Sequence, residues 1–173
     1  MRWFSRRPTM GVDASLESTF ESLQLSPVLL AVLDEIGYRL PTPVQVASIP
    51  ALLMGRDLIG QSKTGSGKTA AFALPILARL DLGARSLQAL VLCPTRELSA
   101  QVARELRKLG RGYPGLSVLE VVGGQPSRPQ RESLARGVHV VVGTPRRQID
   151  HLPVEHSMAE TEARKIKDAI GHP

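Results

Sequence analysis

Cysteine and aromatic residues are scarce in this chain of 173 residues, and each shortage excludes a class of protein. Because Cys93 is the only cysteine, the chain can form no internal disulfide and no zinc site built from cysteines. We therefore expect a reducing, cytoplasmic environment and no disulfide-linked partner. Phenylalanine, tyrosine and tryptophan together make up 3% of the residues, so the hydrophobic core must be mainly aliphatic.

Long hydrophobic runs are also missing, since no apolar stretch approaches the ~20 residues that a membrane-spanning helix requires. The first ten residues contain arginines with no apolar segment behind them, so neither a secretory signal nor a membrane partner is expected. What the chain does have is positive charge: 22 Lys and Arg residues against 16 Asp and Glu residues give a net charge of +6. This excess suits a polyanionic partner without identifying one.

Hydrophobic periodicity predicts an alternation of helices and short apolar strands over most of the chain. Helices are expected over residues 26–36, 42–55, 67–80, 97–109 and 129–136. Strands buried on both faces are expected over residues 57–61, 89–93, 116–122 and 138–142. The alternation indicates an α/β fold with a mostly parallel sheet and flanking helices. A doubly wound nucleotide-binding domain usually has more strands than this, so we expect the domain to be incomplete.

The segment SKTGSGKT at residues 62–69 has the pattern of a phosphate-binding loop between a strand and a helix. Its two glycines allow the backbone amides to turn inward and allow phosphates to approach closely. Lys68 would bring a positive charge to the β- and γ-phosphates, and the Thr69 hydroxyl would coordinate Mg²⁺. Ser62 departs from the usual glycine or alanine but is small. The alternative is a loop that only turns the chain, and the motif alone does not choose among kinases, GTPases, transporters and helicases.

Further motifs, in the right order around this loop, resemble those of the DEAD-box ATP-dependent RNA helicases. The segment GYRLPTPVQ at residues 37–45 resembles the family's Q motif, and PTREL at residues 94–98 resembles its motif Ia. Residues 123–124 resemble the paired-glycine turn, and TPRR at residues 144–147 resembles motif Ib. The resemblance covers roughly residues 20–152, and the wording of KTGSGKTAAF and LCPTREL is most similar to the bacterial DbpA subgroup.

This resemblance implies an incomplete RecA-like phosphate-loop domain that binds ATP and Mg²⁺ and contacts the RNA backbone without reading base sequence. A second RecA-like domain is implied as a partner. Lys68 and Thr69 are the implied catalytic pair, and Thr69 is the implied metal ligand. The residues implied at the nucleotide site are Phe20, Tyr38, Arg39, Gln45, Ser62, Lys63, Thr64, Gly65, Ser66, Gly67, Lys68 and Thr69. Those implied at the RNA surface are Pro94, Thr95, Arg96, Glu97, Gly123, Gly124, Thr144, Pro145 and Arg147.

Gln45 and Phe20 have side chains whose chemistry suits recognition of a base. The Gln45 amide offers a donor and an acceptor, which complement N7 and the amino group of adenine. Standing alone it would be interpreted as a solvated helix residue, but its place in PTPVQ ahead of the loop favours the base. For Phe20, stacking on the base and simple core packing are equally good interpretations.

Motif Ia follows an expected strand, at the strand end where open α/β sheets bind ligands. Thr95 is predicted to cap the next helix, whose first amides and Arg96 face a place where a phosphate could lie. The alternative is that Thr95 and Glu97 only cap the helix. Thr144 repeats the arrangement, so the two sites could hold successive phosphates of one strand, with the paired glycines between them. Arg146 stands where the family has glycine, so its charge could attract RNA while its bulk hinders close approach.

The Asp-Glu-Ala-Asp motif, by which the family holds Mg²⁺ and orients the attacking water, is missing from the sequence, as is the Ser-Ala-Thr motif. We expect a basic tail at residues 1–14, a partial helicase domain at residues 15–152 and a divergent tail at residues 153–173. The loss of central strands beside the loop would leave an apolar edge unpaired.

Three hypotheses follow for the function. The first is the N-terminal part of a DEAD-box helicase, cut short by a frameshift, a premature stop or a gene-model error, and unable to unwind RNA alone. The second is a short module that binds ATP or RNA without turnover. The third is another phosphate-loop NTPase or a kinase.

Overall fold

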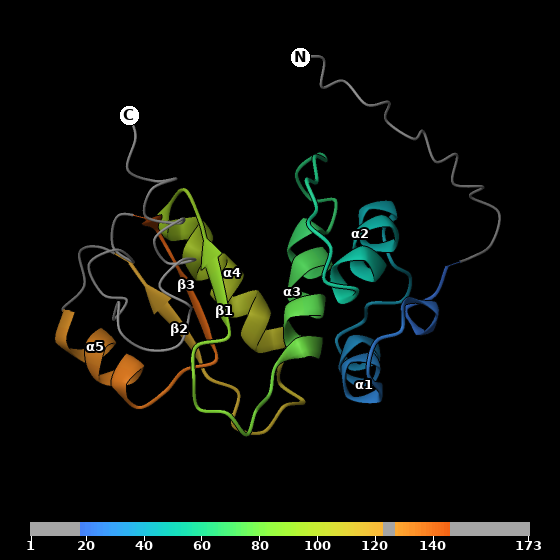
Figure 1. Ribbon diagram of the computed structural model, residues 1–173. Coiled ribbons are helices and arrows are strands. Elements are labelled where there is room, and N and C mark those ends of the chain that lie inside the picture. Colours follow the sequence, from blue (N-terminus) through green and yellow to red (C-terminus); the bar gives the residue numbers. More distant parts are fainter. Residues whose placement is uncertain (1–17, 123–126, 146–173) are drawn as a thin grey trace, which may run out of the picture.

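The computed structural model describes residues 18–122 and 127–145 (Figure 1). The predicted tails, residues 1–14 and 153–173, lie outside the described residues, and so does the boundary expected at residue 152. All the expected helices form between residues 26 and 136. The elements in chain order are η1 (Glu21–Leu23), α1 (Pro27–Glu35), α2 (Pro43–Leu53), α3 (Lys68–Arg79), β1 (Ala89–Leu92), α4 (Arg96–Leu109), β2 (Val118–Val121), α5 (Ser127–Ala135) and β3 (Val140–Gly143).

The strands form a parallel sheet in the order β1-β3-β2. Helix α4 covers one face through Leu106, which belongs to the same core as Val140, and α5 covers the other face through Leu134, which packs with Val141 (Figure 1). The parallel sheet with flanking helices is therefore confirmed. Burial on both faces is confirmed only for the central strand β3, because β1 and β2 lie at the edges and remain partly exposed.

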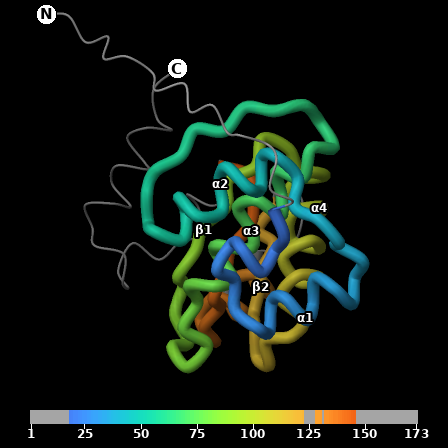
Figure 2. The backbone as a smooth tube through the Cα atoms, turned by 90° about the vertical axis from the view of Figure 1, so that its right-hand side faces the viewer, coloured from blue at the N-terminus to red at the C-terminus, as the bar shows by residue number. Residues whose placement is uncertain are grey.

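The first expected strand, residues 57–61, does not form, and this prediction is wrong. The Ile59 side chain is fully exposed and Leu58 is 45% exposed. The segment runs as part of an open arc between α2 and the start of α3 (Figure 2). None of the described strands pairs with it. Apolar composition cannot by itself create a strand, because the N–H and C=O groups of a strand must pair with a neighbour.

Helices α3 and α1 pack against α4, and α2 packs against α3, all on the side away from α5 (Figure 1). At the start of α1 the Ser26 hydroxyl accepts from the Leu29 N–H at 3.3 Å, and after its end Gly37 has a φ of 84°. The core is aliphatic as expected. Within the described residues, no helix has the length and apolar character needed to cross a membrane. The largest fully buried aliphatic side chains are Leu29, Leu33, Ile49, Leu74, Leu77, Leu106, Leu109, Val121, Val140 and Val141.

Candidate functional site

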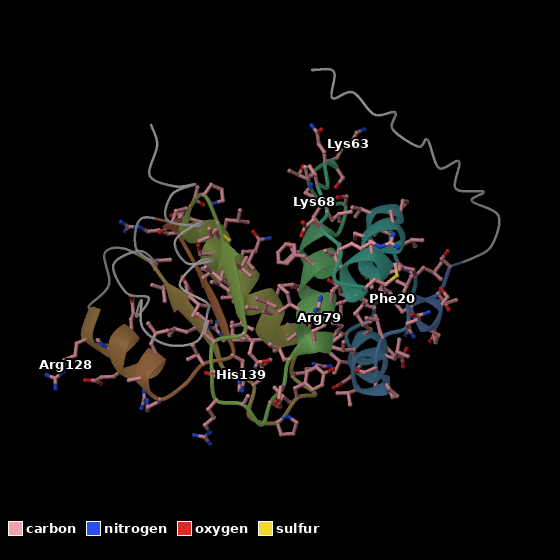
Figure 3. The ribbon with its side chains drawn as sticks, viewed as in Figure 1. Phe20, Lys63, Lys68, Arg79, Arg128 and His139 are labelled. Carbon is pink, nitrogen blue, oxygen red and sulfur yellow. The ribbon has the colours of Figure 1, made fainter. Side chains whose placement is uncertain are left out.

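The loop at residues 62–69 leads directly into α3, as the sequence predicts, and Figure 3 shows Lys63 and Lys68 at that end of the helix. Gly65 and Gly67 have positive φ values of 76° and 87°, which side-chain-bearing residues rarely adopt. Gly67 is the N-cap of α3, and no side chain caps the helix. The first amides of α3 therefore face the loop without a protein side chain to accept their hydrogen bonds, which is the arrangement that binds an anion.

Lys68 lies over its own loop. Its Nζ atom donates to the backbone carbonyls of Ser62 and Lys63, at 2.6 Å for the second. The Ser62 and Ser66 hydroxyls lie 2.7 Å apart and close the loop across its base. Since carbonyl oxygens are weaker partners for an ammonium than phosphate oxygens are, Lys68 can exchange these bonds for a bound anion.

Gln45 is buried, with 1% of its surface exposed, so its interpretation as a solvated helix residue is excluded. Its Oε1 atom accepts from the Thr42 N–H at 2.9 Å, and its Nε2 atom donates to the Gly67 carbonyl at 3.2 Å. The Thr42 hydroxyl is also buried and has no hydrogen-bond partner. The start of α2 and the start of α3 are thus joined through one amide. To read a base, that amide must exchange at least one of these bonds.

Phe20, Tyr38 and Arg39 come together elsewhere, around a cavity of about 160 Å³ whose lining does not include Gln45. The Phe20 ring is buried in the core, 6.2 Å from the Tyr38 ring between centroids. Arg39 forms an exposed ion pair with Asp34 at 2.6 Å. Phe20, Tyr38 and Arg39 thus line one cavity, and Gln45 makes its contacts at the starts of α2 and α3.

Tyr38 has a partner that sequence reasoning missed. Its hydroxyl donates to Glu105 Oε1 at 2.8 Å, from the turn after α1 to the middle of α4. Burial, together with this carboxylate, raises the pKa of Tyr38 to about 12. The two residues are 67 positions apart in the sequence, and no local pattern could have indicated their contact.

The expected RNA-facing residues of motif Ia are exposed at the end of β1. The prediction that Thr95 caps α4 is confirmed, since its hydroxyl accepts from the Leu98 N–H at 3.2 Å. Arg96 and Glu97 occupy the first turn and are exposed, as is Pro94 before them. Cys93, directly after β1, is buried, and burial raises the pKa of its thiol.

Thr144 and Pro145 follow β3, which is the direct neighbour of β1, and the Cys93 N–H donates to the Gly143 carbonyl at 2.9 Å. Motifs Ia and Ib therefore begin side by side. Strand β2, which precedes the paired glycines, pairs with the other side of β3, at the edge of the sheet. Gly123, Gly124, Arg146 and Arg147 themselves lie outside the described residues.

Comparison with known sequences supports this set of motifs. The family model described as DEAD/DEAH box helicase matches residues 42–169. The chain is 53% identical over 128 residues to the ATP-dependent RNA helicase DbpA of Escherichia coli, covering 74% of this chain and 28% of that protein. It is 48% identical over 139 residues to the ATP-dependent RNA helicase DeaD of Mycobacterium tuberculosis, covering 80% and 25%. The chain thus spans between a quarter and a third of the length of these relatives.

Solved structures give the same result for the fold. A DEAD box protein from the hyperthermophile Methanococcus jannaschii matches with a TM-score of 0.73 and 37% identity, covering 77% of this chain and 36% of that one. Dbp5 of S. cerevisiae, solved with RNA and ADP BeF3, matches with a TM-score of 0.69 and 29% identity, covering 86% and 34%. The arrangement of helices around the parallel sheet is therefore shared with these proteins.

Proposed function

Because the chain belongs to the DEAD/DEAH box helicase family, we propose that it is the ATP-binding N-terminal part of an ATP-dependent RNA helicase. The observation that carries this proposal is the loop at residues 62–69. There, two glycines with positive φ present the uncapped start of α3, and Lys68 lies over the loop with bonds that an anion can replace. This geometry suits the phosphates of a nucleotide, whichever base is attached.

The loop also fits Mg²⁺ bound together with a nucleotide. Thr69 follows Lys68 in the first turn of α3 and is only partly buried, so its hydroxyl can serve as one oxygen ligand while phosphate oxygens supply others. Lys68 would neutralise phosphate charge, and the α3 amides would hold the phosphate oxygens. Since an acidic strand-end motif is missing from the sequence, we propose nucleotide binding for this chain and no unwinding by it alone.

Adenine recognition is proposed for Gln45 through an exchange of hydrogen bonds. Its amide donates to the carbonyl of Gly67, the residue immediately before Lys68, so base and phosphates would meet the same short stretch of backbone. An amide that accepts from the adenine amino group and donates to N7 matches adenine, whereas guanine offers two acceptors at the corresponding positions. The buried Gln45 therefore supports ATP over GTP as the ligand.

We expect ATP to displace a fluorescent adenine nucleotide about tenfold better than GTP does, because a matched pair of base contacts discriminates by this order. In Gln45→Ala the two nucleotides should compete about equally. Urea unfolding of each variant checks that the domain stays folded, since the substitution also removes two buried hydrogen bonds. Equal competition by ATP and GTP in the unchanged chain would instead favour another phosphate-loop enzyme.

RNA is the proposed partner of the surface formed by Thr95, Arg96 and Thr144 at the ends of β1 and β3. The α4 amides and Arg96 can hold backbone phosphates there without reading bases. Affinity for single-stranded RNA should therefore fall with salt, and Arg96→Ala should reduce the slope of log affinity against log salt by about 0.7.

Filter binding with an unstructured oligouridylate at several salt concentrations measures that slope. Arg128→Ala is the matched control, because Arg128 lies on α5, away from this edge of the sheet, in an exposed ion pair with Glu132 (Figure 3). A slope that Arg96→Ala leaves unchanged would remove Arg96 from the RNA surface.

A further inference from the structure

Two side chains of α4 hold Tyr38. The Tyr38 hydroxyl donates to Glu105 Oε1 at 2.8 Å, and Lys108 Nζ lies 5.5 Å from the centroid of the Tyr38 ring. Glu105 and Lys108 are three residues apart, so they share one face of the helix. Glu105 therefore holds the hydroxyl group by a hydrogen bond, and Lys108 lies over the face of the ring in a cation–π contact.

The Tyr38–Glu105 bond is of the stronger kind. Both side chains are partly buried, and the acceptor is a carboxylate, which makes the hydrogen bond charge-assisted. Burial first, and then Glu105, raise the pKa of Tyr38 to about 12. The phenol consequently keeps its proton in alkaline solution in which a free tyrosine would lose it, and it remains a donor to Glu105.

A short stretch of backbone connects Tyr38 to the proposed base site at Gln45. Tyr38 is fixed on its N-terminal side by the end of α1, where its N–H donates to the Leu33 carbonyl at 2.9 Å. On the other side, three residues lead from Tyr38 to Thr42, which caps α2 and whose N–H donates to Gln45. A shift of Tyr38 would therefore be passed within one short turn to the amide that meets Gly67.

We infer that Glu105 is a positioning residue that, through Tyr38, holds the segment from Thr42 to Gln45 in place for purine recognition. This inference rests on the proposed binding of ATP and extends it to a residue on α4. Glu105, on α4, accepts from the Tyr38 hydroxyl, so its effect on Gln45 would act through Tyr38. It should therefore concern the base of the nucleotide and leave the phosphates untouched.

Calorimetric titration of ATP and of inorganic tripolyphosphate tests this distinction. Glu105→Ala should weaken ATP binding about tenfold, because a hydrogen bond to a charged group is lost, and should leave tripolyphosphate binding within about twofold. Glu105→Gln should bind ATP within about threefold of the unchanged chain, since its amide oxygen can accept from the same hydroxyl. Tyr38→Phe should reproduce Glu105→Ala, and the double variant should lose no more than either single one.

Glu132→Ala is the matched control, because Glu132 is an exposed acid on α5 that pairs with Arg128. Equal ATP affinity in Glu105→Ala and the unchanged chain would overturn the inference and leave the proposed function standing. Parallel losses of ATP and tripolyphosphate affinity would also overturn it, since they indicate general damage to the domain. If the unchanged chain binds no ATP, or if Lys68→Ala binds ATP equally well, the proposed function fails, and the inference fails with it.

Discussion

Lys68→Ala should raise the dissociation constant for ATP at least about 100-fold, because an ammonium that meets phosphate oxygens contributes about 3 kcal/mol to binding. The structure gives the reason why this lysine matters more than the other loop cation. Lys68 Nζ is already drawn over the loop by the carbonyls of Ser62 and Lys63, so it is placed where an anion held by the α3 amides would lie. Lys63, at the tip of the loop, is exposed (Figure 3).

Calorimetry with ATP and Mg²⁺ measures this loss directly. Arg85→Ala serves as the control for loss of one positive charge, since Arg85 is an exposed residue ahead of β1 and outside the loop. The free energy of unfolding should change little in Lys68→Ala, because the hydrogen bonds of Lys68 go to the carbonyls of an exposed residue, Lys63, and a partly buried one, Ser62. An ATP affinity within about threefold of the unchanged chain would show that residues 62–69 are not a phosphate site.

Gly67→Ala should lower the free energy of unfolding by about 3 kcal/mol, from two separate causes. The first is the backbone, since a φ of 87° is strained for any residue with a Cβ atom. The second is contact with the protein itself: a Cβ at this position would lie 2.5 Å from Gln45 Nε2 and 3.1 Å from the Thr42 hydroxyl. Gln45 is buried and cannot move away without giving up its bonds to Thr42 and Gly67.

Gly65→Ala separates these causes, because Gly65 has a similar φ of 76° but nothing lies within 4 Å of a Cβ built there. It should cost only the backbone strain, about 1 kcal/mol. Urea unfolding of both variants gives the comparison, and the double variant Gly67→Ala, Gln45→Ala should recover part of the loss because the collision is gone. Equal losses of unfolding free energy in Gly65→Ala and Gly67→Ala would show that a Cβ at position 67 does not clash with Gln45.

Local sequence patterns were sufficient for the helices and for most of their ends. Thr95 caps α4 as predicted and Gly37 follows the end of α1, because capping and left-handed turns involve only neighbouring residues. The same holds for the phosphate loop, whose glycines and lysine lie within one short segment. The family was likewise readable from motif order, and the match over residues 42–169 confirms it.

The strand prediction at residues 57–61 failed because strand formation depends on distant residues and not on neighbours alone. Their apolar composition is that of a buried strand, yet the structure leaves Ile59 fully exposed because none of the described strands pairs with them. The strand order β1-β3-β2 was equally beyond local reasoning, and it places motif Ib directly beside motif Ia. Pairing depends on which edges meet in space, and no periodicity within one segment contains that information.

On its own, then, the amino-acid order settled where most helices lie and to which family the chain belongs, and it gave the residues proposed to hold a phosphate. Only the three-dimensional packing decided what each polar group touches. It brought the Gln45 amide to the Gly67 carbonyl, 22 positions along the chain, and Glu105 to Tyr38 across 67 positions, whereas the bond between Gln45 and the Thr42 N–H is local. The physical reason is that a hydrogen bond between distant residues forms only after hydrophobic burial has brought their helices together, and burial is a property of the whole fold.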